Sequence, residues 1–259
     1  MATYNKRGGK IRKKKEIDND IEILEEESTT AEVFSSLDEG ANRTEEWVAK
    51  NSKFIYIILG SALLIALGVW AYQNLIVRPN QEKAVTEMVD VNELFQEAGA
   101  ESNITTQDSL YKQVLSGRNG NYGVIDIAEK YGNTAAGNQA HYMAGIAYLR
   151  TGQYKKAVEQ LQQFDGNGTA LDAIAQGAIG DAFAQIDDTE EAYNYYKRAV
   201  AVSNDNFTAS KYSYKAGIMA LELGKNDEAR ELFNTIKEDY SDMDEATKVD
   251  IYLGQLDAQ

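Results

Sequence analysis

The sequence predicts an all-α protein with a disordered N-terminal tail, one transmembrane helix and an α-solenoid of repeated helix pairs. Three observations support this fold class. The 259 residues include one proline, and proline interrupts helices, so its scarcity favours long helices. An uncharged apolar run, FIYIILGSALLIALGVWAY, extends over residues 54–72. After it, a pattern of small and large residues recurs every 35 to 37 residues, as expected for a stacked array.

Residues 1–53 are expected to form a cytoplasmic tail that is largely disordered. The basic run KIRKKK is followed closely by the acidic block IDNDIEILEEE, and charge blocks with few aromatic residues are typical of disorder. Phe34, Leu37 and Trp47 lie among charges, which indicates a short amphipathic helix within residues 31–53. The basic run could contact anionic lipid or ribosomal RNA. We favour a topology signal, because the neighbouring acids cancel much of its field.

Residues 54–77 are expected to cross a membrane once and to contact its lipids. A bilayer core of about 30 Å requires about 20 apolar helical residues. Aromatic residues at both edges, such as Phe54 and Trp70, resemble an interfacial belt. More lysines and arginines precede the run than follow it closely, and positive flanks stay in the cytoplasm. The sequence therefore predicts a single-pass inner (plasma) membrane protein with a cytoplasmic N-terminus and an extracytoplasmic, periplasmic remainder.

A membrane-proximal helix is predicted within residues 78–103. Ala84, Met88, Val91 and Leu94 recur at helical spacing and define one apolar face. Pro79 fits the first turn of this helix, where a missing N–H leaves no hydrogen bond unmade.

The following residues repeat an order of small, large, turn, small, large and apolar positions. Two small residues on antiparallel helices allow the backbones to approach, and we expect the large residues to fill the space toward the next pair. A glycine at the turn position permits a positive φ at the helix end. The three sets are Gly145, Tyr148, Gly152, Ala157, Leu161 and Phe164; Gly180, Phe183, Asp187, Ala192, Tyr196 and Ala199; and Gly217, Ala220, Gly224, Ala229, Phe233 and Ile236.

These residues resemble the tetratricopeptide repeat, most closely in the G-x-x-Y-x-x-x-G-x-x-x-x-A spacing from Gly145 to Ala157. The resemblance implies a repeat domain over residues 104–259, with repeats at about 104–137, 138–172, 173–209 and 210–243 and a closing helix at 244–257. It also implies a concave groove that binds polypeptides. The groove residues that it implies are Tyr142, Ile146, Leu149, Arg150, Asp181, Gln185, Lys211, Tyr214, Ile218 and Glu222.

The residue types of enzymes and cofactor sites are scarce. Cysteine is absent and His141 is the single histidine, so thiolate chemistry and a serine–histidine triad have no support. The Gly-rich stretch GRNGNYG lacks the lysine of a phosphate-binding loop. The net charge of −15 disfavours nucleic acid as a partner. We therefore expect no enzyme activity, no cofactor and no metal.

The order of tail, span, helix and acidic repeat domain is similar to that of the ancillary subunit family of the bacterial Sec translocon. That resemblance implies a scaffold whose partners are channel subunits, periplasmic chaperones or secreted polypeptides. An alternative is a coordinator of envelope assembly or cell division that uses the same groove. A third hypothesis, an enzyme or small-molecule sensor, would require a polar pocket that no sequence motif indicates.

Overall fold

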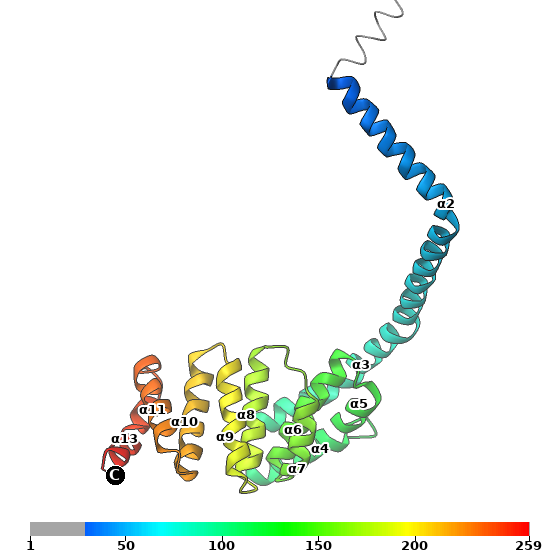
Figure 1. Ribbon diagram of the computed structural model, residues 1–259. Coiled ribbons are helices and arrows are strands. Elements are labelled where there is room, and N and C mark those ends of the chain that lie inside the picture. Colours follow the sequence, from blue (N-terminus) through cyan, green and yellow to red (C-terminus); the bar gives the residue numbers. More distant parts are fainter. Residues whose placement is uncertain (1–28, 259) are drawn as a thin grey trace, which may run out of the picture. The chain divides into compact units, whose positions relative to one another are not determined.

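The computed structural model describes the backbone of residues 29–258 and the side chains of residues 47–258. Every regular element in these residues is a helix, and the prediction of an all-α fold is confirmed (Figure 1). The basic and acidic blocks of the predicted disordered tail, residues 1–28, lie outside the described residues. The chain divides into two compact units, Met1–Ala71 and Tyr72–Gln259.

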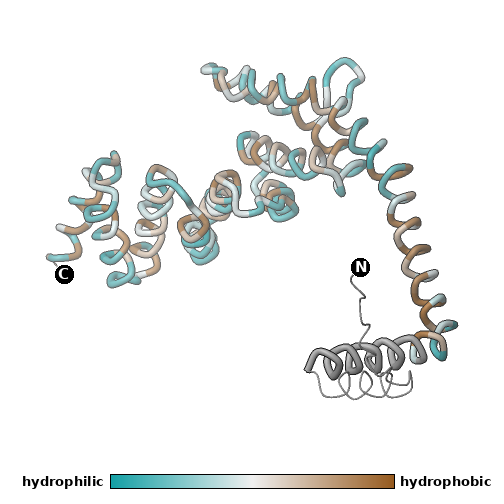
Figure 2. The backbone as a smooth tube through the Cα atoms, turned by 90° about the horizontal axis from the view of Figure 1, so that it is seen from above, coloured by the Kyte–Doolittle hydropathy of each residue, from teal (hydrophilic) through white to brown (hydrophobic). Residues whose placement is uncertain are grey.

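The first unit consists of α2, Thr29–Tyr72, in its described part. Residues 29–53 are thus helical rather than disordered, and the helix is longer than the short amphipathic segment that the sequence predicted. Its second half carries the apolar run, coloured brown in Figure 2. Phe54 and Leu64 are 68% and 71% exposed there. Among the described residues, one helix, Trp47–Ala100, is long and apolar enough to cross a membrane.

The second unit begins with a π-helical turn, η1, Gln73–Val77, followed by α3, Arg78–Ala100. The Arg78 N–H donates to the Gln73 carbonyl, five residues back. Pro79 lies in the first turn of α3, as the sequence predicted, but helical backbone precedes it. A proline inside helical backbone removes one hydrogen bond and crowds the carbonyl four residues earlier. The wider π turn accommodates the proline without ending the helix.

Helix α3 buries one face and packs against three helices: α4, Ile104–Ser116; α5, Val124–Tyr131; and α6, Ala135–Arg150. Asn103 caps α4 by accepting a hydrogen bond from the Thr106 N–H at 3.1 Å. The predicted first repeat differs from a standard helix pair, because α4 packs more extensively against α3 and α6 than against α5. The buried residues of α3 are Ala84, Met88, Val91, Leu94 and Ala98.

Three antiparallel helix pairs follow. They are α6, Ala135–Arg150, with α7, Tyr154–Gln163; α8, Ala170–Ala184, with α9, Thr189–Val202; and α10, Asn206–Glu222, with α11, Asn226–Asp239. Figure 1 shows them in chain order, each pair packed on the next.

The turns inside the three pairs share one backbone conformation. Gly152 and Gly224 have φ values of +73° and +71°, as the sequence predicted. Asp187 occupies the same position in the middle pair at φ +62°. A side chain other than glycine adopts this conformation at a cost, and aspartate is among the residues that tolerate it best.

The closing segment is two short helices rather than the single helix predicted for residues 244–257. Helix α12 is Glu245–Lys248 and α13 is Asp250–Asp257. Val249 lies between them and is fully buried. The break lets Ala246 in α12 and Leu256 in α13 both join the C-terminal core cluster.

The repeated glycines receive large side chains of their own helix pair. A Cβ on Gly145 would lie 2.4 Å from Leu161 Cγ, and one on Gly217 would lie 2.3 Å from Phe233 Cε1. In the middle pair a Cβ on Gly180 would lie 2.7 Å from the Tyr196 ring. This corrects the expectation that these large residues fill the space toward the next pair. Each packs on the glycine of its own first helix, which is why that position has no side chain.

Candidate functional site

A pocket of about 480 Å³ lies within the second unit, where three first helices and the start of α4 meet. It lies at the C-terminal ends of α6 and α8, so residues far apart in the sequence converge on it. The lining residues are Gln107 of α4, Leu149 and Arg150 of α6, Tyr154 of α7, Asp181, Ala184 and Gln185 at the end of α8, Tyr196 of α9 and Lys215 of α10.

Ala184 creates the space. When the three pairs are aligned on their glycines, Ala184 occupies the position of Leu149 in the preceding pair and Leu221 in the following one. Both leucines are partly buried against the core clusters. The smaller alanine removes about three methyl or methylene groups from the wall, and it lines the pocket that results.

Asp181 is the electrostatic centre of the pocket. Its Oδ1 accepts a hydrogen bond of 2.7 Å from the Tyr196 hydroxyl and forms an ion pair with Lys215 Nζ. The Lys215 ammonium also lies 5.5 Å from the Tyr196 ring centroid and 5.9 Å from that of Tyr212, within cation–π range. Opposite charges in direct contact make this wall polar but close to neutral.

The pKa values of the surrounding tyrosines are raised. Burial raises the pKa of Tyr196 well above its ordinary value, and the neighbouring Asp181 carboxylate raises it further. Burial and the same carboxylate raise the pKa of Tyr212. Both phenols therefore stay neutral at physiological pH, and Tyr196 serves as a hydrogen-bond donor rather than an acid.

Two amide side chains and a hydroxyl complete the polar rim. The Tyr154 hydroxyl donates to Gln185 Oε1 at 3.2 Å. Gln107 Nε2 donates to the Ala98 and Glu101 carbonyls at 3.1 and 2.9 Å, which fixes the turn between α3 and α4. Arg150 is exposed at the rim.

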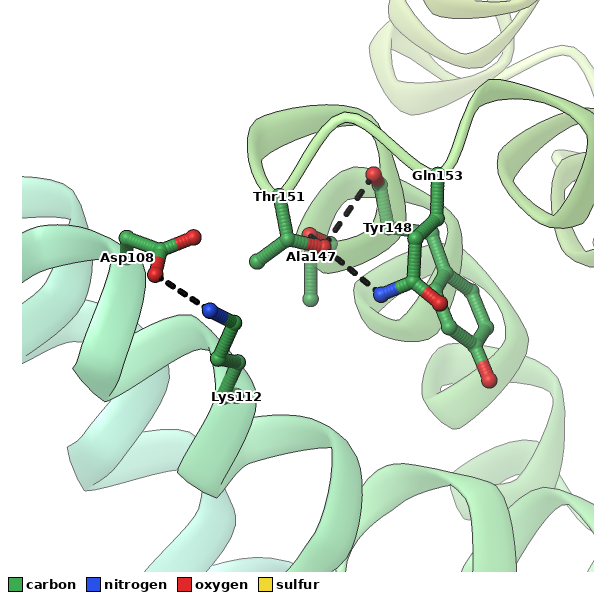
Figure 3. Close-up of polar contacts among 6 residues, drawn as sticks. All are labelled: Asp108, Lys112, Ala147, Tyr148, Thr151 and Gln153. Atoms are coloured by element: carbon green, nitrogen blue, oxygen red, sulfur yellow. Dashed lines mark hydrogen bonds and ion pairs between the residues drawn. The ribbon is translucent and has the colours of Figure 1, made fainter.

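The end of α6 beside the pocket has a hydrogen-bonded turn of its own (Figure 3). Thr151 Oγ1 donates to the Ala147 carbonyl at 2.9 Å, and Gln153 Nε2 donates to Thr151 Oγ1 at 3.2 Å. On α4, Lys112 and Asp108 form an ion pair of 2.6 Å. The Thr151 and Gln153 contacts fix the end of α6, from which Leu149 reaches the pocket, whereas the Asp108–Lys112 pair lies on the exposed face of α4.

The ten groove residues that the sequence indicated fall into three groups. The structure brings Leu149, Arg150, Asp181 and Gln185 together in the pocket. Exposed Lys211 and Glu222 and half-buried Ile218 lie on α10, outside the residues that line it. Three further residues, Tyr142, Ile146 and Tyr214, are half-buried in packing contacts.

The two groove tyrosines pack against other aromatic rings, Tyr142 within its own helix pair and Tyr214 within its own pair and against the closing segment. The Tyr142 ring lies 5.2 Å from the ring of Phe164, centroid to centroid. Tyr214 lies against Phe233 and Tyr252, and its hydroxyl donates to the Tyr252 hydroxyl at 3.3 Å. Burial and this hydrogen bond raise the pKa of Tyr214 to about 12. Both residues therefore contribute to packing.

Five of the pocket residues were not among the groove residues expected from the sequence: Gln107, Tyr154, Ala184, Tyr196 and Lys215. Tyr196 was expected instead at a large core position of its repeat. Ala184 could have been found, because it interrupts a column of leucines in the aligned repeats. Lys215 could not, since it reaches back to a carboxylate 34 positions earlier. Gln107 depends on how α4 packs, which the repeat pattern does not specify.

The described residues contain no group of three or more carboxylate or imidazole side chains arranged to hold a metal ion. The imidazole of His141 lies 2.9 Å from Gln160 Oε1, on the interface between α6 and α7. It has no titratable or nucleophilic neighbour in that contact. The pocket therefore has a mainly polar lining, with one satisfied ion pair and amide groups.

A tetratricopeptide repeat model matches residues 142–207 and 178–244 of the chain. Together these ranges extend from the middle of α6 to the start of α12 and include most of the pocket. No curated protein matches the chain. The sequence-based assignment of tetratricopeptide repeats is thus supported over the three helix pairs.

Proposed function

We propose that this tetratricopeptide repeat protein is a membrane-anchored scaffold that binds polypeptide partners at the pocket around Ala184. Repeats of this type generally mediate protein–protein interactions. The pocket is the observation that carries the proposal: residues of several helices converge on it, and its carboxylate, Asp181, is already paired with Tyr196 and Lys215. Because it lacks an activated nucleophile or acid–base pair, we propose that the chain is not an enzyme.

The anchor is residues 54–77 of α2 and η1, in one pass. Exposed apolar side chains along this stretch would be unfavourable in water and favourable in lipid. The basic flank of the N-terminal side supports a cytoplasmic N-terminus and an extracytoplasmic repeat domain.

More specifically, we propose that the protein is an accessory subunit of the Sec translocon. This assignment is supported by the order of tail, span and repeats, and by a repeat domain on the same chain as a candidate membrane span. Channel subunits, periplasmic chaperones or secreted chains would then be its partners.

The pocket is tested by Ala184→Leu in the full chain. Leucine fills the hollow and is the residue of the two equivalent positions, so we expect the fold to tolerate it with a stability change within about 1 kcal/mol. A photoreactive residue at Gln185 should then capture partners from native membranes in the wild-type background but several-fold less with Ala184→Leu. Ala201→Leu, at an exposed position of α9, is the matched control and should leave capture unchanged.

Mass spectrometry of the captured proteins separates the partner classes. Channel subunits and chaperones would support the translocon assignment, whereas wall synthases without channel components would replace it with envelope assembly. Equal capture by Ala184→Leu and wild type would refute binding at the pocket. Protease added to the outside of intact spheroplasts should remove the repeats; repeats digested only after the cytoplasm is opened would refute the topology.

A further inference from the structure

We infer that one edge of the repeat domain rests on the surface of the lipid bilayer. This edge, called here the Leu171–Phe207 edge, consists of the connections at residues 164–169 and 203–205 and the first turns of α8 and α10 that follow them. The inference rests on the proposed function, because the anchor keeps the bilayer within reach. It adds a second contact with lipid, outside the span.

Exposed apolar side chains gather on one side of the second unit. Phe207, in the first turn of α10, is 65% exposed, and Leu171, in the first turn of α8, is 42% exposed. A single exposed apolar residue is ordinary on a soluble surface, but these two begin neighbouring first helices. The large apolar side chains exposed in residues 78–258 are Val85, Val89, Ile104, Leu171, Phe207 and Ile251.

The bilayer boundary lies at the same end of the second unit. The proposed span ends at Val77 in η1, which belongs to the same unit as the repeats. Asn92 of α3 accepts a hydrogen bond of 3.2 Å from Gln139, near the start of α6, whereas the later Ala98 carbonyl accepts from Gln107 in the pocket at the end of α6. Helix α3 therefore enters from the side on which the first helices begin. Figure 1 shows the start of α3 and the connections into α8 and α10 at the same, upper edge of the repeat domain.

A bend at the end of the span lets this edge reach the bilayer. The helix from Arg78 to Asn92 is about 21 Å long, so an upright α3 would hold the repeats away from the lipid. The π turn η1 and Pro79 lie where α3 begins, and helices bend at such features. Inclining α3 at this point lowers the edge to the headgroups. It also brings the exposed Val85 and Val89, which precede Asn92, close to the lipid.

The contact is made by apolar side chains and not by charge. The carboxylates beside them serve the loops: Asp205 accepts from the Thr208 N–H at 2.8 Å, and Asp165 accepts from the Asn167 N–H at 3.0 Å. Acidic groups do not attract anionic headgroups. Apolar side chains enter the boundary between headgroups and acyl chains in proportion to the apolar area that they bury. Because the anchor makes the contact intramolecular, two side chains suffice.

The test uses the full chain in vesicles of zwitterionic lipid without other proteins. The sequence has no cysteine, so Asn204→Cys, in the loop before Phe207, carries a single fluorescent probe. Lys155→Cys, an exposed position at the start of α7 on the opposite edge, is the matched control. Lipids brominated near the headgroup quench a probe that touches them. Trp70 lies within the span, so quenching of its emission reports on the anchor separately.

We expect the probe at Asn204 to be quenched several-fold more than the probe at Lys155. The quenching should persist in about 1 M salt, where charges are screened within about 3 Å. It should fall to the level of Lys155 in the double variant Leu171→Ser, Phe207→Ser. Both residues are exposed, so this variant should keep the wild-type unfolding temperature.

Three results would contradict the inference. Equal quenching at Asn204 and Lys155, or undiminished quenching in the double variant, would overturn the contact at this edge. Quenching that disappears in about 1 M salt would overturn its apolar character. If Trp70 is quenched in these cases, the proposed anchor stands. An unquenched Trp70 would overturn both the inference and the proposed membrane anchor.

Discussion

The clearest test of the packing is Gly177→Ala in α8. Gly177 is buried beneath the ring of Tyr212, which reaches it from α10 of the next pair. A Cβ at Gly177 would lie 2.0 Å from Tyr212 Cε1 and Cζ and 2.4 Å from its hydroxyl oxygen, whereas ordinary contacts begin at 3.4 Å. The ring would have to retreat by about 1.4 Å. It cannot do so alone, because it stacks at 6.1 Å on Tyr196, which itself packs on Gly180.

The expected cost combines three effects. Overpacking a close-packed core costs about 1–3 kcal/mol, and a displacement of this size belongs at the upper end. Disturbing the tyrosine stack adds about 0.5–1 kcal/mol. Alanine is the better helix former by about 1 kcal/mol, which offsets part of the loss. We expect the free energy of unfolding to fall by about 2–3 kcal/mol, a Tm decrease of about 4–12 °C for a domain of this size.

The measurement is urea and thermal unfolding of the full chain in detergent, followed by circular dichroism. Gly254→Ala in α13 is the matched control, because no atom lies within 4 Å of its Cβ position, and it should gain up to about 1 kcal/mol. Adding Tyr212→Leu to Gly177→Ala should recover part of the loss, so that the double variant is less destabilised than the sum of the two single ones. If Gly177→Ala unfolded at the wild-type temperature or above, the argument that the Tyr212 ring leaves no room for a side chain at position 177 would be refuted.

Three further predictions concern the turn, the pocket and alkaline pH. Because Asp187 has φ +62°, Asp187→Gly should be neutral or stabilising by up to about 1 kcal/mol in urea unfolding, and Asp187→Val should cost about 1–2 kcal/mol. Equal effects of the two variants would contradict the argument that this positive φ disfavours a branched side chain. Tyr196→Phe removes the hydrogen bond to Asp181 and keeps the ring, so chemical unfolding should show a loss of about 1.5–3 kcal/mol; no loss would mean that the bond is not formed. The pKa values of Tyr196 and Tyr212 are raised in the fold, so the stability that their neutral forms contribute is full below pH 10 and is lost as the unfolded chain ionises above it, by about 1.4 kcal/mol per pH unit per tyrosine; more tyrosinate absorbance at pH 10 in the wild type than in a variant with both residues changed to phenylalanine, with unchanged circular dichroism, would contradict this.

Local features of the fold follow directly from the sequence. The apolar run, the 35-to-37-residue period and the turn glycines are short-range signals, because each depends on residues within one helix or one turn. Gly152 and Gly224 adopt the positive φ that their turn position predicts, and Asp187 takes the same conformation without being glycine. Aligning the three helix pairs on their glycines also shows that Ala184 stands where the other two pairs have leucine. The repeat pattern alone did not indicate that this position lines a pocket.

The surroundings of that pocket were decided by tertiary structure. Helix α4 has the length of a repeat helix, but it packs more extensively on α3 and α6 than on α5. Lys215 of α10 pairs with Asp181 of α8 in the preceding helix pair, Tyr142 packs on Phe164 of its own pair, and Tyr214 packs on Tyr252 of the closing segment. Helical periodicity assigns a residue to a face of its own helix, but the partner of that face depends on burial and charge pairing summed over distant segments. For this reason the sequence determined the helices and their order, and the tertiary packing determined which of the predicted groove residues meet in one pocket.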